Sequence, residues 1–194
     1  MPRFLALSLL LAAGLAHAHT DPVMAGGFAT GFLHPLAGVD HLLAMVAVGI
    51  WGAALGLPLI WVLPVAFPLL MVAGGVLGIA GIPIPFVETG IAASVLVLGL
   101  CIVAAWRAPV AVAVAIVAAF GLLHGHAHGT ELPSAASPAA YSAGFVIATG
   151  LLHLAGIGIG KLRGLPRGEI ILRGSGALIA AAGVWILAGM PGVG

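Results

Sequence analysis

Long apolar segments separated by short breaks dominate the chain from residue 23 onward. The breaks are rich in glycine, proline or charged residues, which are typical of loops. They fall at residues 56–58, 81–85, 107–109, 130–138 and 161–168. The apolar segments between them are 30–54, 59–80, 87–106, 110–128, 139–160 and 169–190. Each is close to the about 20 residues with which a helix crosses a bilayer, so the pattern predicts a bundle of six transmembrane helices.

The first apolar segment is longer than one bilayer crossing. From Val23 to Leu55 it would form a helix of about 33 residues and roughly 50 Å, whereas the hydrocarbon core is about 30 Å thick. Pro35 and Gly38 interrupt this segment. We therefore expect a short outer helix that ends near His34, followed by the membrane span proper.

The N-terminal residues form a different pattern. Arg3 precedes an apolar run from Phe4 to Leu15 that is too short to span a bilayer. Positions 16–18 then read Ala-His-Ala, which matches a signal-peptide cleavage site. We expect residues 1–18 to be a cleaved secretory signal peptide and residues 19–194 to form a single six-helix domain. An uncleaved anchor helix is the alternative.

Basic residues test the direction of the helices independently. If the mature N-terminus lies outside, the breaks that follow the first, third and fifth spans face the cytoplasm. All lysines and arginines after residue 18 lie in or close to these breaks, namely Arg107, Lys161, Arg163, Arg167 and Arg173. This distribution follows the positive-inside rule. It predicts that both termini of the mature chain lie outside, which requires an even number of spans.

Composition supports a membrane protein and excludes several other classes. Of the 194 residues, 62% are hydrophobic and 6% are charged, whereas an average soluble domain is about 25% charged. The net charge of +1 offers no basic patch for nucleic acid. The single cysteine, Cys101, can form neither a disulfide framework nor a Cys-rich zinc site. We predict an all-α integral membrane protein, whose partner is the lipid bilayer and which could form a homo-oligomer. The signal peptide implies that this membrane is a prokaryotic-type inner membrane.

Ionisable residues at membrane depth are costly, and they are therefore candidates for function. The first group is His34, Asp40 and His41, at the start of the first span. The histidines are seven residues apart, so on a continuous helix they would share a face. We expect Asp40 and His41 to lie in the outer half of the span.

A second group lies at the end of the fourth span. His124 and His128 are spaced i, i+4 and face one way, and Glu131 follows His128 at i+3. His126 is expected to point elsewhere on the same helix. Because the fourth span runs outward, this group lies on the same side of the membrane as the first, and Glu88 at the start of the third span joins them.

Imidazoles and carboxylates together are ligands of Ni, Co, Zn, Cu or Fe(II) rather than of Mg²⁺ or Ca²⁺, which prefer oxygen. The carboxylates also offset the charge of a divalent ion in a medium of low dielectric constant. His153, near the middle of the fifth span, is a candidate second stop on an inward path. Polar contact between helices is the alternative for His153 and for both groups.

The two histidine-rich segments resemble the motifs of a known family. HPLAGVDHLLAM at 34–45 and HGHAHGTE at 124–131 are similar to the motifs of the HupE/UreJ family. Those proteins are bacterial inner-membrane proteins linked to nickel or cobalt uptake for hydrogenase and urease. The resemblance covers essentially the whole mature chain, and by position it implies metal-motif roles for His34, Asp40, His41, His128 and Glu131. The broader nickel/cobalt permease class carries a similar motif with one fewer residue between its His and Asp. Five residues separate His34 from Asp40 here, so this chain resembles that class only at a distance.

These observations predict a secondary permease, not an enzyme, that imports Ni²⁺ or Co²⁺, with Zn²⁺ as a further candidate. The chain has no P-loop, but the membrane potential supplies about 2.3 kcal/mol per charge per 100 mV. No permanently bound cofactor is expected. One alternative is an intramembrane zinc hydrolase with Glu88 or Glu131 as the general base. Another is a haem protein that uses a pair such as His34 and His153 as axial ligands.

Overall fold

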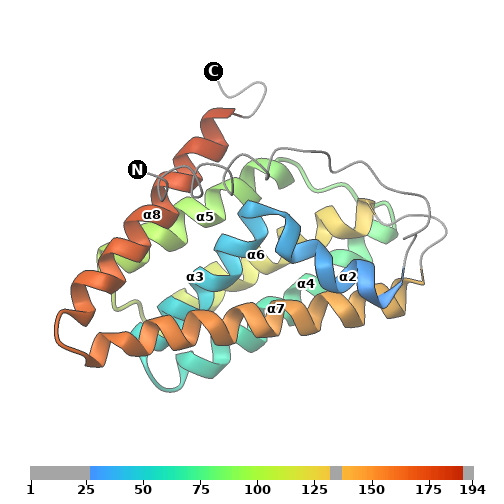
Figure 1. The fold of residues 1–194 in the computed structure, drawn as a ribbon. Helices are drawn as coiled ribbons and strands as arrows, with labels where there is room; N and C mark the ends of the chain where they lie inside the picture. The colour runs from blue at the N-terminus through green and yellow to red at the C-terminus, as the bar shows by residue number, and fades with distance from the viewer. Residues whose placement is uncertain (1–26, 132–136, 190–194) are drawn as a thin grey trace, which may run out of the picture.

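The computed structural model describes residues 27–131 and 137–189, and the expected signal peptide lies outside this part of the chain. Within these ranges the chain forms helices joined by short turns, with no strand. The helices, shown in Figure 1, are α2 (Phe28–Ala37), α3 (Val39–Leu55), α4 (Leu59–Ile79), α5 (Val87–Val103), α6 (Val110–Glu131), α7 (Pro138–Lys161) and α8 (Gly168–Gly189), with the short 3-10 helix η3 (Leu162–Gly164) after α7. The prediction of an all-α protein is confirmed.

The helices coincide with the six predicted apolar segments. Four of them, α4, α6, α8 and α7 with its η3 extension, are each long and apolar enough to cross a bilayer. The α2–α3 pair passes the same test when it is taken together, with a bend of 84° between its halves. The apolar helix α5 has 17 residues and is shorter than the other candidates. By length and composition the described residues thus hold four or five candidate spans, and six crossings stay a prediction.

The break in the first segment is present, but it lies later than predicted. α2 continues past His34 and Pro35, and the chain becomes extended at Gly38, with φ −86° and ψ 118°. A Cβ atom at Gly38 would lie 3.0 Å from Asp40 Oδ1 and 3.1 Å from His41 Nδ1. Glycine therefore leaves room for these two side chains to fold back over the break, which the proline does not explain.

The helices pack chiefly as pairs, α4 with α6, α5 with α8 and α3 with α7, and α2 lies against α7 (Figure 1). The α4–α6 pair is especially close. A Cβ atom at Gly74 would overlap the carbonyl oxygen of Leu122, and one at Gly125 would overlap that of Met71. The hydrophobic effect does not drive helices together within lipid, and small residues instead let their backbones approach closely enough to pack. The same contact fixes the position of the α6 histidines along the axis of the bundle.

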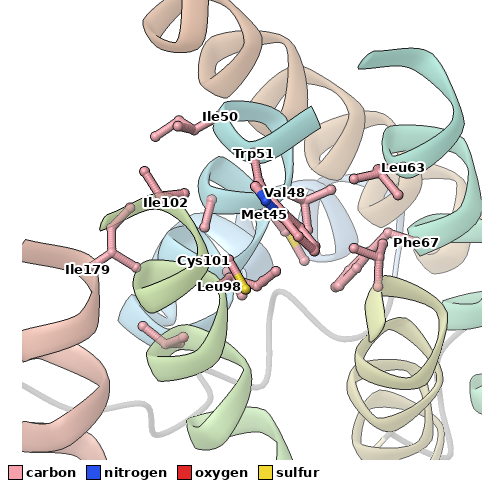
Figure 2. Close-up of a cluster of buried hydrophobic side chains, with 14 of the residues drawn as sticks. Met45, Val48, Ile50, Trp51, Leu63, Phe67, Leu98, Cys101, Ile102 and Ile179 are labelled. Atoms are coloured by element: carbon pink, nitrogen blue, oxygen red, sulfur yellow. The ribbon is translucent and has the colours of Figure 1, made fainter. Parts of the chain in front are cut away.

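α3 forms the centre of the bundle. Its Met45, Val48 and Trp51 are at most 1% exposed, and they pack with Phe67 of α4 and Leu98 of α5 (Figure 2). A helix that is apolar on all sides is expected to be buried on all sides. The polar residues in the first turn of α3 therefore lie at one end of the protein core.

Candidate metal centre

Asp40 and His41 occupy the first turn of α3, immediately after the break at Gly38. Asp40 Oδ1 accepts a hydrogen bond from the backbone N–H of His41 at 2.8 Å and lies 2.7 Å from His41 Nδ1. A carboxylate bonded to one imidazole nitrogen orients the ring and leaves the other nitrogen available to a metal. That other nitrogen, Nε2 of His41, is buried and has no hydrogen-bond partner.

Histidines from α2 and α6 surround this ring. The centroid of the His41 ring lies 4.8 Å from that of His124 and 4.6 Å from that of His128. The ring of His34 lies 4.7 Å from His128 and 6.2 Å from His41. These four residues, named here the histidine cluster, come from three helices and from distant parts of the chain.

The buried nitrogens of the cluster lack ordinary partners. His124 Nδ1 lies 2.9 Å from the carbonyl oxygen of Phe120, but His124 Nε2 is buried without a partner, as are both ring nitrogens of His128. Buried polar atoms in folded proteins are nearly always hydrogen-bonded. Unpartnered lone pairs from several rings in one place are what a metal ion requires.

Two histidines of the cluster form, together with Glu131, a group that could hold a metal ion. His34, His128 and Glu131 each offer one ligand atom, and these atoms all lie within 4.8 Å of one another. Within the described residues this is the one group of three or more histidine, cysteine or acidic side chains that could close around an ion. Glu131 is exposed, His34 is half-buried and His128 is buried, so the group leads inward from the surface.

Two predicted residues, Glu88 and His153, lie apart from both the histidine cluster and the carboxylates of Asp40 and Glu131 that adjoin it. Glu88 is in the first turn of α5, exposed and near enough for its charge to act on Glu131. His153 lies further along the bundle on α7, with its ring 5.5 Å from that of Phe67. The structure therefore places Glu88 near Glu131, at the same end of the bundle as the cluster, and His153 further along α7.

His126 has a different role from its neighbours on α6. Its Nε2 lies 2.7 Å from the carbonyl oxygen of Ile82, in the turn that joins α4 to α5. This places the ring against the α4–α5 turn, and not among the rings of the histidine cluster. The prediction that His126 points elsewhere is confirmed.

Aromatic side chains line the cluster and were missed by sequence reasoning. Phe145 of α7 contacts His128 at 4.3 Å between ring centroids, and Tyr141 and Phe145 both lie 6.0 Å from His34. Phe67 of α4 lies 5.3 Å from His124. In an apolar sequence such residues look like ordinary packing. The only available signal was the spacing of Tyr141 and Phe145, which share a helix face at i, i+4.

Comparison with known proteins decides the family. A family model described as HupE / UreJ protein matches residues 7–186. The chain belongs to the HupE/UreJ family. It is also 44% identical, over 183 residues, to Protein HupE of Rhizobium leguminosarum bv. viciae, with 94% of this chain and 95% of that protein covered. No solved structure gives a significant match.

Membership of the HupE/UreJ family identifies the chain as a multi-pass membrane protein related to nickel and cobalt transport. Proteins of this family are related to transport and are not enzymes. The zinc-hydrolase alternative is therefore not favoured.

Proposed function

We propose that this HupE/UreJ family protein is a permease that imports Ni²⁺ or Co²⁺ across the bacterial inner membrane through the histidine cluster. One observation carries the proposal. Four imidazoles and two carboxylates from α2, α3 and α6 gather at one end of the bundle, and several of their buried nitrogens have no partner. Imidazole with carboxylate suits these borderline metals.

Each residue of the site has a separate role in binding the metal ion. Glu131, with Glu88 beside it, attracts the hydrated cation, and His34 and His128 replace its first water ligands. Asp40 orients His41 and offsets part of the charge of the ion. His124 lies deepest on α6, one helical turn below His128, and receives the ion next.

Basic residues at the opposite end of the bundle support the orientation in the membrane that inward transport requires. Arg163, just after α7, donates from Nη1 to the carbonyl of Ala54 near the end of α3, at 3.0 Å. Its Nε donates to Glu169 Oε2 at 3.0 Å, and Arg173 lies 3.5 Å from Glu169 Oε1. By the positive-inside rule the arginine end faces the cytoplasm and the histidine cluster faces the periplasm. Six crossings, both mature termini outside and a cleaved signal peptide complete this topology.

The test is uptake of radioactive nickel by cells that lack other nickel carriers, with cobalt or zinc as competitor. At matched membrane levels, we expect Asp40→Asn and His41→Ala to lower the rate about 10- to 100-fold, as is usual when metal ligands or their orienting partners are lost. His126→Gln, which replaces a buried histidine outside the cluster, is the control and should retain uptake. Unchanged nickel accumulation in both site variants would exclude these residues as the transport site.

A further inference from the structure

A second set of buried polar atoms lies beyond the histidine cluster, on α7. His153 is 1% exposed and Thr149 is 0% exposed. Both ring nitrogens of His153 and the hydroxyl oxygen of Thr149 are buried without a hydrogen-bond partner. The two residues are spaced i, i+4 and lie on one helix face. Threonine in a helix usually bonds to a carbonyl one turn earlier, so this hydroxyl is unusual in being unpartnered.

α4 contributes a backbone oxygen to the same place. Pro64 and Pro68 both lie inside α4. Because Pro68 has no N–H, the carbonyl of Pro64 lacks the helical donor that would normally bond to it. Pro64 precedes Phe67 by three residues on α4 and so lies on the helix face whose Phe67 ring is 5.5 Å from the ring of His153. Transporters use such freed carbonyls of interrupted helices as ion ligands.

Phe67 separates these atoms from the histidine cluster. Its fully buried ring lies 5.3 Å from the ring of His124 on one side and 5.5 Å from that of His153 on the other. One face of α7 runs from the histidine cluster to the same place, because it carries Phe145, Thr149 and His153 at i+4 steps. From Phe145, which touches His128, to His153 the helix rises about 12 Å.

We propose that Thr149, His153 and the carbonyl oxygen of Pro64 form an inner relay site that accepts the divalent metal ion from His124 past the Phe67 ring. The inference rests on the proposed function, since it assigns the next step of the same path. None of the three ligands carries a negative charge, so the inner site holds the ion less tightly than the outer one. Weaker binding at an inner site favours onward release, as conduction through successive sites requires.

The test separates binding from passage. The full chain carries His153→Ala or Thr149→Val, with Thr149→Ser as the variant that restores a hydroxyl. Initial rates of radioactive nickel uptake are measured in cells at matched membrane levels. The Kd of the purified proteins for nickel is measured by equilibrium dialysis. His126→Gln again serves as the control for the loss of a buried histidine.

We expect His153→Ala and Thr149→Val to lower the uptake rate about tenfold or more, the usual consequence of losing a metal partner. Their nickel Kd should stay that of the parent, because the outer cluster is intact, and Thr149→Ser should recover uptake. Uptake at the parent rate in both variants would overturn the inner site. If His153→Ala is not inserted into the membrane, the uptake rate of Thr149→Val decides whether the inner site exists. A parent chain that accumulates no nickel would instead disprove the proposed function.

Discussion

At two histidines of the cluster, His41 and His124, a protein oxygen engages one nitrogen of the ring and leaves the other free. His41 Nδ1 faces Asp40, His124 Nδ1 faces the carbonyl of Phe120, and Nε2 of each ring has no partner. A hydrogen bond at one nitrogen fixes the tautomer, so the lone pair lies on the other. Nε2 of each ring is therefore the nitrogen that is available to a metal ion.

Glu131 is the acidic member of the outermost ligand group, and its charge can be removed with little change of shape. We expect Glu131→Gln to weaken nickel binding by the purified protein at least about tenfold, equal to about 1.4 kcal/mol. The reason is that the amide keeps an oxygen ligand but no longer offsets the charge of the ion. Equilibrium dialysis measures this Kd directly.

Glu169→Gln is the matched control for that substitution, because Glu169 lies at the opposite end of the bundle in contact with Arg163. Its nickel Kd should equal that of the parent. Equal affinities for Glu131→Gln and the parent would remove Glu131 from the site.

The contact between α4 and α6 sets the position of two cluster histidines, and it depends on glycine. We expect Gly125→Ala to destabilise the protein by about 1–3 kcal/mol, the usual range for overpacking, because the added Cβ atom would overlap the Met71 carbonyl. Thermal unfolding in detergent measures the change. Gly150→Ala in α7 is the control, since a Cβ atom there has no neighbour within 4 Å.

Gly150→Ala should leave the melting temperature unchanged or raise it slightly, because alanine favours helix over glycine. If the Gly125 and Gly150 variants melted together, the α4–α6 contact would not be as close as described.

Helix positions could be predicted well from the sequence, and the reason is physical. A backbone in lipid must satisfy its own hydrogen bonds, so each helix requires a long apolar run with breaks at its ends. The break in the first segment was predicted near His34 but lies at Gly38, because Pro35 is accommodated inside α2. The sequence indicated Pro35 and Gly38 together as the interruption, and it could not show that the side chains of Asp40 and His41 fold back over Gly38.

The candidate site was predictable only in part. Topology correctly brought His34, His41, His124 and His128 to one end of the bundle, because alternate spans run in opposite directions. It could not separate Glu88 from the ligand group or reveal that Phe67 lies next to His124. Those relations depend on rotation of each helix about its axis, which the glycine contacts set and the apolar pattern does not encode.

The orientation of the bundle in the membrane is open to a direct labelling test. Phe86, next to α5, and Leu57, between α3 and α4, are 81% and 80% exposed at opposite ends of the bundle, and native Cys101 is buried. With the histidine cluster toward the periplasm, a membrane-impermeant maleimide should label Phe86→Cys in intact spheroplasts. Leu57→Cys should react only after lysis. The reverse labelling would show that the cluster faces the cytoplasm, which is incompatible with capture from the periplasm.

The bend at Gly38 also links the shape of the protein to the number of donors around the ion. His34 belongs to α2, whereas His41, His124 and His128 belong to α3 and α6, on the other side of that bend. The position of this one imidazole relative to the other three rings therefore depends on the backbone angle at Gly38 and on the contact of α2 with α7.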